Sequence, residues 1–283
     1  MNSIDYAHFV ALVKTRLGID LGPDKAYLLN SRLQSIANTE GFEDVAALLQ
    51  AVRVRPDPRF VDAAVEALTT NETLFFRDVV PFEQLRVLLA KLAAARPSAP
   101  IRIWCAACST GQEPYSIAML AEEESPRLLG ARVEILATDV SPRCLEIARA
   151  GVYSQFEAQR GLSIQRLARH FEQNGAGWVI KPALRAMVTW KRLNLMENFR
   201  GVGQFDIVFC RNVLIYFERQ TKREILTRIA TQMHDGATLF LGAAETTLGV
   251  CDAFDSAGVA HGSHIKRAAN ASAAPPPAAA AVR

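Results

Sequence analysis

Hydrophobic positions along the chain follow two different periods, and the change between them comes near residue 100. Before that point apolar residues recur at helical spacing, and no stretch alternates as a strand would. From Ile101 onward, short apolar runs alternate with amphipathic helical segments. Such alternation is typical of a mostly parallel sheet with helices on both faces. The pattern therefore predicts an all-α N-terminal domain followed by an α/β domain.

The N-terminal domain is expected to be a small helical bundle. Phe9 and Leu17 lie on one face of its first helix, which Ser3 or Asp5 can cap, and Gly18 breaks the chain after it. A long amphipathic helix then leads into the second domain. The expected helices cover residues 2–17, 25–38, 45–52, 60–68 and 81–95.

The second domain is expected to alternate strands and helices. Residues 172–188, which hold Gly175 and Gly177, predict a short hairpin-like insertion. Strands are expected at 101–105, 133–138, 188–193, 205–210 and 237–242, with a further strand near 259–266. Helices are expected at 113–124, 142–150, 163–171 and 219–234.

Composition fits a globular enzyme and narrows its setting. Of the 283 residues, 50% are hydrophobic and 22% are charged, and the net charge of +3 is too small to argue for nucleic-acid binding. No apolar run approaches the length of a membrane span, and no signal peptide is visible. The five scattered cysteines favour free thiols in the cytoplasm. The Ala- and Pro-rich residues 268–283 predict a disordered tail, with a linker to a further module as the weaker alternative.

The segment 101–117 predicts a ligand turn between a strand and a helix. Its turn, residues 105–111, has only Gly111 and lacks the three glycines of a pyrophosphate site. One glycine suits a less demanding neighbour, such as the methionine part of S-adenosylmethionine (SAM). A purely structural turn is the alternative. Cys105 and Cys108 could suggest a metal or redox site, but no second cysteine pair stands at zinc spacing.

Asp139 ends the second expected strand. An acid at the carboxyl end of that strand is where such folds grip a ribose diol. The alternative is that Asp139 caps the helix that begins at Pro142. Ser141 is the better cap, which leaves Asp139 for the ribose.

Two further segments combine polar and aromatic residues in an unusual way. Residues 71–77, NETLFFR, lie between the two domains, and Arg211, Asn212 and Tyr216 follow the strand expected at 205–210. Buried polar side chains need partners, so both segments would suit a closed ligand site. The alternatives are an interdomain linker, an ion pair for Arg211 and ordinary core packing for Tyr216.

Six motifs in this order carry a family resemblance: TNETLFFRD, RIWCAACSTGQEPYSIAM, ILATDVSPRCLEIARAGVYS, RLNLME, FDIVFCRNVLIYF and LFLGAAET. Together they resemble the CheR-type chemoreceptor glutamate methyltransferases, and the similarity covers about residues 4–266. The resemblance implies a helical receptor-docking domain with its linker (1–78). It also implies a Rossmann-like SAM-dependent methyltransferase domain (79–267) with a small antiparallel β insertion near 174–190.

The resemblance also implies the site residues. Asn71, Thr73 and Arg77 match positions that close over SAM, and Arg77 and Tyr216 match residues that face the reacting glutamate. No metal is expected. The remaining cofactor positions are Glu113, Asp139 for the ribose, Asn194 and Leu195 beside the adenine, and Arg211 and Asn212.

The implied activity is methyl transfer from SAM to glutamate carboxylates on the cytoplasmic helices of methyl-accepting chemoreceptors, with S-adenosylhomocysteine (SAH) as product. A SAM-binding adaptor with little turnover and a methyltransferase for small carboxylic acids are the alternatives. The expected partner is the receptor's cytoplasmic domain, with no nucleic acid, no membrane insertion and a monomeric state. Two departures from the family stand out. The helix expected at 25–38 carries only Lys25 and Arg32 as cations, and the insertion is short, which puts a tethering peptide in doubt.

Overall fold

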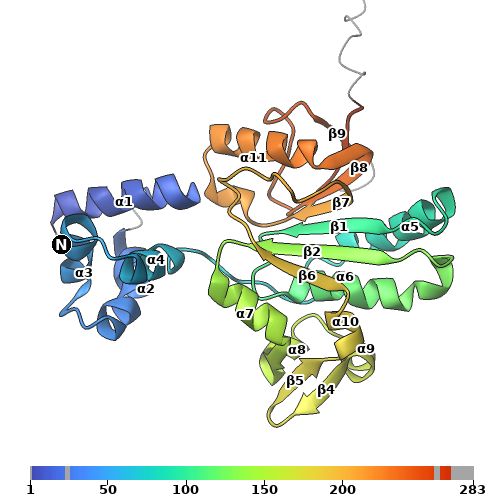
Figure 1. Ribbon diagram of the computed structural model, residues 1–283, viewed down its shortest axis with the longest axis horizontal. Helices are drawn as coiled ribbons and strands as arrows, with labels where there is room; N and C mark the ends of the chain where they lie inside the picture. The colour runs from blue at the N-terminus through green and yellow to red at the C-terminus, as the bar shows by residue number, and fades with distance from the viewer. Residues whose placement is uncertain (1, 23–25, 258–261, 269–283) are drawn as a thin grey trace, which may run out of the picture.

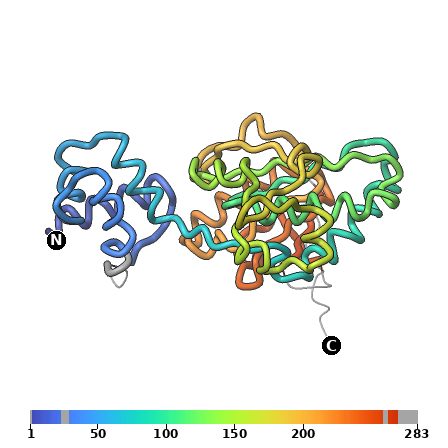
Figure 2. Tube along the Cα trace, turned by 90° about the horizontal axis from the view of Figure 1, so that it is seen from below, coloured from blue at the N-terminus to red at the C-terminus, as the bar shows by residue number. Residues whose placement is uncertain are grey.

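The chain folds around separate hydrophobic cores in its two domains. The structure, a computed structural model, describes residues 2–22, 26–257 and 262–268. Both views show the helical domain to one side of the larger domain, joined to it by the linker, residues 67–79 (Figures 1 and 2). The apolar residues of the helical domain pack only on one another and a few neighbours, as the change of period predicted.

The helical domain closes around Phe9, Leu33, Leu48 and their neighbours. Its first helix is capped by Asn2, whose side chain accepts from the N–H of Ile4. The expectation that Ser3 or Asp5 caps it is therefore wrong. Asp5 is instead buried, with its carboxylate paired with Arg53 of the third helix. The helices are α1 (Ser3–Leu17), α2 (Ala26–Thr39), α3 (Val45–Val54) and α4 (Pro58–Glu66). Lys25, the expected start of α2, lies outside the described residues.

The second domain is built on a twisted seven-stranded sheet in the described part of the chain, with strand order β6-β2-β1-β7-β8-β10-β9. The first four neighbouring pairs are parallel and the last two are antiparallel. The expected mostly parallel sheet is confirmed. The strands are β1 (Ile101–Ala106), β2 (Val133–Asp139), β6 (Val188–Arg192), β7 (Phe205–Cys210), β8 (Met233–Leu241), β9 (Phe254–Ser256) and β10 (Ser263–Lys266).

The two edge strands differ from the sequence-based expectation. β9 was not expected, because three residues are too few for a period of two to be recognised. β10 falls within the strand expected near 259–266, but residues 259–261 lie outside the described part of the chain, as do residues 269–283 of the expected tail.

Helices cover both faces of this sheet (Figure 1). Along β1, Ile101, Ile103 and Cys105 point to one core while Trp104 and Ala106 point to the other, which is the alternation of a strand buried on both faces. The first core contains residues of α5 (Val80–Ala95), α6 (Gln112–Glu123) and α7 (Pro142–Ala150), and the second contains residues of α11 (Arg219–Thr231). Short 3₁₀ turns are η2 (Ser125–Arg127) and η3 (Leu214–Tyr216). None of the helices in the described ranges is long and apolar enough to cross a membrane.

The β insertion is larger than expected and begins earlier. It starts at β3, directly after Gly151 ends α7, and its three strands pair antiparallel in the order β3-β5-β4. The expected bounds near 174–190 are therefore wrong at both ends, because β6 within them belongs to the main sheet. The three residues of β3 were too short to show a strand pattern. The insertion comprises β3 (Val152–Ser154), α8 (Gln155–Gln159), α9 (Ile164–His170), β4 (Phe171–Asn174), β5 (Gly177–Ile180) and α10 (Pro182–Arg185).

One carboxylate joins the insertion to the main domain. Glu123, at the end of α6, receives two 2.9 Å hydrogen bonds from Arg166 of α9, and the ring of His170 lies 3.1 Å away. The guanidinium of Arg166 also lies 3.8 Å from the ring centre of Phe76 in the linker. Burial opposes ionisation of Glu123, but the hydrogen bonds from His170 and Arg166 outweigh it and lower its pKa to about 2.

We predict that Glu123→Gln destabilises the protein and changes its acid response. A carboxyl whose folded pKa is depressed contributes stability that is complete above its unfolded pKa, near 4.5, and is lost as the pH falls toward 2. Because Glu123 is only partly buried, solvent screening reduces the effect, and the variant should lose about 1–2 kcal/mol of unfolding free energy at pH 7, measured by urea titration. The difference from wild type should narrow as the pH is lowered from 4.5.

Glu122→Gln is the matched control, because Glu122 pairs with Arg169, whose side chain is 53% exposed. This neighbouring variant should change stability far less. A deficit in Glu123→Gln that stays constant between pH 7 and pH 3 would contradict the assignment.

Candidate active site

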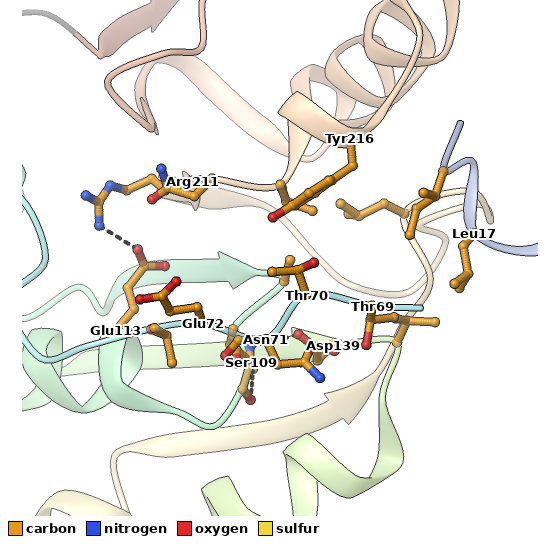
Figure 3. A pocket seen from close by; sticks show the side chains of 18 of the residues that line it. Leu17, Thr69, Thr70, Asn71, Glu72, Ser109, Glu113, Asp139, Arg211 and Tyr216 are labelled. Atoms are coloured by element: carbon orange, nitrogen blue, oxygen red, sulfur yellow. Dashed lines mark hydrogen bonds and ion pairs between the residues drawn. The ribbon is translucent and has the colours of Figure 1, made fainter. Parts of the chain in front are cut away.

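A single cleft lies at the carboxyl ends of β1, β2 and β7, where the strand order reverses on either side of β1. This is the point at which open α/β sheets bind ligands. The cleft has about 970 Å³ of empty space, its open mouth included. All ten residues singled out from the sequence line it, although they come from five separate parts of the chain (Figure 3). They are Asn71, Thr73, Arg77, Glu113, Asp139, Asn194, Leu195, Arg211, Asn212 and Tyr216.

The turn between β1 and α6 forms one wall with an unusual backbone. Ala107 and Ser109 have φ of 59° and 50°, and Gly111 has φ of 95°. Left-handed conformations are uncommon for residues other than glycine and often mark functional turns. At Gly111 a Cβ atom would lie 2.9 Å from Cβ of Ala148, so the close approach of α7 also requires glycine. The single glycine noted in the sequence therefore stands where both the backbone conformation and the packing disfavour a side chain.

Asp139 holds the two loops beside it. One carboxylate oxygen accepts from the N–H of Ser109 at 2.8 Å, and the other accepts from the N–H of Ser141 at 2.9 Å. Ser141 itself caps α7, as the sequence predicted, by accepting from the N–H of Cys144. Burial raises the pKa of Asp139, against the effect of these N–H donors. Each oxygen keeps a further lone pair for a ligand in the cleft.

Arg211 is the buried cation of the site. Its guanidinium donates to Glu113 of α6 at 2.9 Å, and to the carboxylate of Asp78 and the carbonyl of Arg77 in the linker at 2.7 and 2.8 Å. The side chain is only 2% exposed, and Figure 3 shows it turned from the end of β7 toward Glu113. Burial raises the pKa of Glu113, and Arg211 offsets part of that rise. The alternative that Arg211 forms an ion pair is thus confirmed. Its hydrogen bonds join β7, α6 and the linker.

Arg77 and Tyr216 differ from Arg211 because their polar groups are available. Arg77 donates to the carbonyl of Glu72 at 3.2 Å, and among the described residues no carboxylate lies within ion-pair distance of it. Tyr216 extends its ring into the cleft (Figure 3), and within the described ranges its hydroxyl has no hydrogen-bond partner. Among the described residues, the cleft therefore presents a guanidinium without a carboxylate partner, that of Arg77, and an available hydroxyl donor, that of Tyr216.

The linker is held in place from both sides of the cleft. Ser109 donates its hydroxyl to the carbonyl of Asn71 at 2.7 Å, and the N–H of Phe76 donates to the hydroxyl of Ser116 in α6 at 2.9 Å. Phe75 is fully buried, with its ring edge-on to Tyr153 of the insertion at 5.0 Å between ring centres. The two phenylalanines anchor the linker, while its polar residues face the cleft.

The helical domain contributes residues that the sequence did not reveal. Leu17 and Ile19 line the cleft, and Ile19 forms an isolated antiparallel bridge with Phe217, next to Tyr216. Asn194 donates its side-chain amide to the carbonyl of Arg16 at 2.6 Å, so this expected adenine-side residue also joins the two domains. The helical periodicity of α1 explained Leu17 as a core residue, and only the tertiary structure places it beside the cleft.

The cysteines of the turn are packing residues in this geometry. Cys105 and Cys108 are buried free thiols, and burial raises the pKa of each well above its ordinary value. Thiols in that state are poor nucleophiles and poor metal ligands. In the described ranges no group of three or more His, Cys, Asp or Glu could hold a metal ion.

Fold and cleft together define the class of SAM-dependent methyltransferases. Residues 71–262 match the family model of the CheR methyltransferase SAM-binding domain, and residues 4–69 match that of the CheR methyltransferase all-alpha domain. The chain therefore belongs to the CheR methyltransferase family, as its motifs indicated.

Named relatives are similar over almost their whole length. The chain is 41% identical over 255 residues to chemotaxis protein methyltransferase Cher2 of Pseudomonas putida, covering 88% of this chain and 93% of that protein. It is 44% identical over 246 residues to chemotaxis protein methyltransferase 1 of Pseudomonas aeruginosa, covering 85% and 89%.

We predict that Arg211→Met costs about 3–5 kcal/mol of unfolding free energy, because it leaves the buried carboxylate of Glu113 without its partner. Adding Glu113→Gln should recover part of this loss, since the double variant no longer buries an unpaired charge. Urea titrations of both variants measure the effect. Lys14→Met breaks an ion pair with Glu218 in which both side chains are nearly half exposed, and it should have a much smaller effect. Equal losses in Arg211→Met and Lys14→Met would refute this account of the pair.

Proposed function

We propose that this protein transfers the methyl group of SAM to glutamate side chains on the cytoplasmic helices of chemotaxis receptors, and so acts in the cytoplasm. The products are glutamate methyl esters and SAH. The observation that carries the proposal is the convergence of the ten motif residues on one cleft, where Arg77 has no carboxylate partner among the described residues. The chemotaxis methyltransferase names of its relatives support the same conclusion.

The residues that line the cleft suit the chemistry of SAM. In this proposal Asp139 binds the ribose diol, and Asn194 and Leu195 border the adenine. Asn71 and Thr73, on the anchored linker, close over the cofactor. The other cofactor positions are Glu113, Arg77, Arg211 and Asn212, of which Arg211 acts by holding Glu113 and the linker in place.

Bound SAM supplies an electrophilic methyl group on a sulfonium centre. The acceptor glutamate is already ionised at neutral pH, because its ordinary pKa is about 4.3, so the site needs no strong general base. Arg77 holds one carboxylate oxygen through its guanidinium fork, and Tyr216 donates a hydrogen bond. These contacts align the acceptor, and the linker excludes water from the cleft. The chain's contribution is thus positioning rather than activation.

Receptor docking through the positive charge of α2 is not supported. Arg32 donates to the carbonyls of Leu68 and Thr69 at 2.7 and 3.0 Å, and to the hydroxyl of Thr70 at 3.0 Å. This cation of α2 therefore steadies the start of the linker instead of facing a partner. The first 78 residues hold 8 Lys and Arg against 11 Asp and Glu. We infer that the acceptor helix is recognised mainly at the mouth of the cleft, beside Arg77 and Tyr216.

Asp139→Ala should weaken binding of SAH and SAM by about 10- to 100-fold, because a buried carboxylate that accepts from the ligand is lost. Isothermal titration calorimetry measures both affinities. Ser141→Ala is the control. It removes the cap of α7 and should cost about 1 kcal/mol of stability while leaving the affinities unchanged. Wild-type affinity in Asp139→Ala would rule out the ribose assignment.

The acceptor is tested with methyl-labelled SAM and purified cytoplasmic fragments of chemoreceptors. We expect base-labile label on the fragments, because carboxyl methyl esters hydrolyse in base and methylated amines do not. Arg77→Ala should lower kcat/KM at least tenfold, and Arg77→Lys should recover only part of it, since lysine lacks the planar fork. Tight SAM binding with no labelled fragment would favour the adaptor alternative. Label on small carboxylic acids alone would favour the alternative of a methyltransferase for small carboxylic acids.

A further inference from the structure

A second buried carboxylate organises the opposite side of the cleft. Glu245 follows the end of β8 and is 9% exposed. One of its oxygens accepts from the N–H of Gly242 at 2.7 Å and from the N–H of Asn212 at 2.8 Å. The other accepts from the N–H of Ile215 at 3.2 Å. Glu245 therefore ties the carboxyl ends of the neighbouring strands β7 and β8 to each other.

The backbone that Glu245 holds carries two of the cleft residues. Asn212 has φ of 58°, a left-handed conformation that is uncommon for residues other than glycine and that asparagine tolerates better than most. Ile215 lies within the η3 turn, whose last residue is Tyr216. Without the carboxylate, the buried N–H of Asn212 would lose its partner and the turn would lose its anchor. The positions of Asn212 and Tyr216 thus depend on one side chain that does not line the cleft.

The packing at Gly242 is an independent sign that this arrangement is tight. A Cβ atom there would lie 2.6 Å from the side-chain amide nitrogen of Asn212 and 2.8 Å from the carboxylate of Glu245. Contacts that close force a neighbour to move, so the strand end leaves room only for glycine. The LFLGAAET motif of the sequence therefore contains both the acid and the glycine that the arrangement requires.

We propose that Glu245 is a positioning residue, which fixes Asn212 against the cofactor and Tyr216 against the acceptor carboxylate. The roles of Asn212 and Tyr216 rest on the proposed function. A carboxylate suits the task because it only accepts, and three N–H groups converge on it. Glutamine is nearly isosteric, but it keeps only one acceptor oxygen and places an NH2 group, which donates, where the other oxygen was. The substitution Glu245→Gln therefore removes one of the two acceptor oxygens and faces at least one of the three N–H groups with another donor, while keeping the volume.

The test begins with SAH affinity, measured by calorimetry, which needs no acceptor protein. Glu245→Gln should weaken SAH binding about tenfold. Asp206→Asn is the matched control, because Asp206 is also buried, also accepts a backbone N–H (from Arg102 at 2.9 Å), and lies near the start of β7, away from the cleft. It should lower thermal stability without changing SAH affinity. Wild-type affinity in a folded Glu245→Gln, or an equal loss in Asp206→Asn, would overturn the proposal.

A double-mutant cycle separates positioning from a general loss of stability. Asn212→Ala, expected to weaken SAH binding about tenfold in the wild-type background, should weaken it less than about threefold in the Glu245→Gln background, because Asn212 is already displaced there. Tyr216→Phe should show the same reduced effect on kcat with receptor fragments. Fully additive SAH affinities would contradict the role of Glu245. If no fragment is methylated by wild type, the proposed acceptor fails while the SAH cycle still decides the role of Glu245.

Gly242→Ala provides a second route to the same answer. It leaves the charge of Glu245 intact but crowds Asn212. We expect it to weaken SAH binding and to be non-additive with Glu245→Gln. A Gly242→Ala variant that binds SAH as wild type does would count against the proposal.

Discussion

The cleft depends above all on the buried guanidinium of Arg211. A buried ion pair is weak evidence for stability, since desolvation offsets much of its attraction. Its value here is geometric. Arg211 fixes three elements at once, because it bonds to Glu113 of α6 and to both Arg77 and Asp78 of the linker. Because Arg211 holds the carbonyl of Arg77, the backbone of Arg77 is fixed in place. The guanidinium of Arg77 itself has no carboxylate partner among the described residues. Arg211 therefore has a structural role, while the guanidinium of Arg77 is available to a ligand.

Backbone N–H groups at the strand ends are organised by buried acids on both sides of β1. Asp139 binds the loop after β1 and the start of α7, and Glu245 binds the loop after β7 and the end of β8. Both loops contain residues other than glycine with positive φ, such as Ser109 and Asn212. Such conformations cost about 1–3 kcal/mol each, and the carboxylates that accept from these N–H groups help to impose them. Part of the backbone strain of the domain therefore lies at the rim of the cleft.

The three parts of the chain meet at the cleft instead of acting as independent modules. The helical domain contributes Leu17 and Ile19 to the lining of the cleft. The insertion contacts the interdomain linker through Arg166, which stacks on Phe76. The insertion also touches the β1 turn, because the hydroxyl of Tyr153 donates to the carbonyl of Thr110 at 2.8 Å. A partner that binds either peripheral part thus has a short physical route to the cofactor site.

The sequence by itself determined the two domains and the parallel sheet, because hydrophobic period is a local property. Strand-end chemistry pointed to Asp139, and the resemblance of the six motifs to a known family supplied most of the other cleft residues. The sequence could not determine the insertion's bounds, since β3 is only three residues long, nor the cap of α1. Only the tertiary structure decided that Arg211 is paired with carboxylates and that Arg77, among the described residues, is not, as the two arginines are separated by 134 residues and their partners come from different elements. It also decided that Leu17, Ile19 and Glu245 serve the site, because their contacts cross domain or strand boundaries that no local pattern encodes.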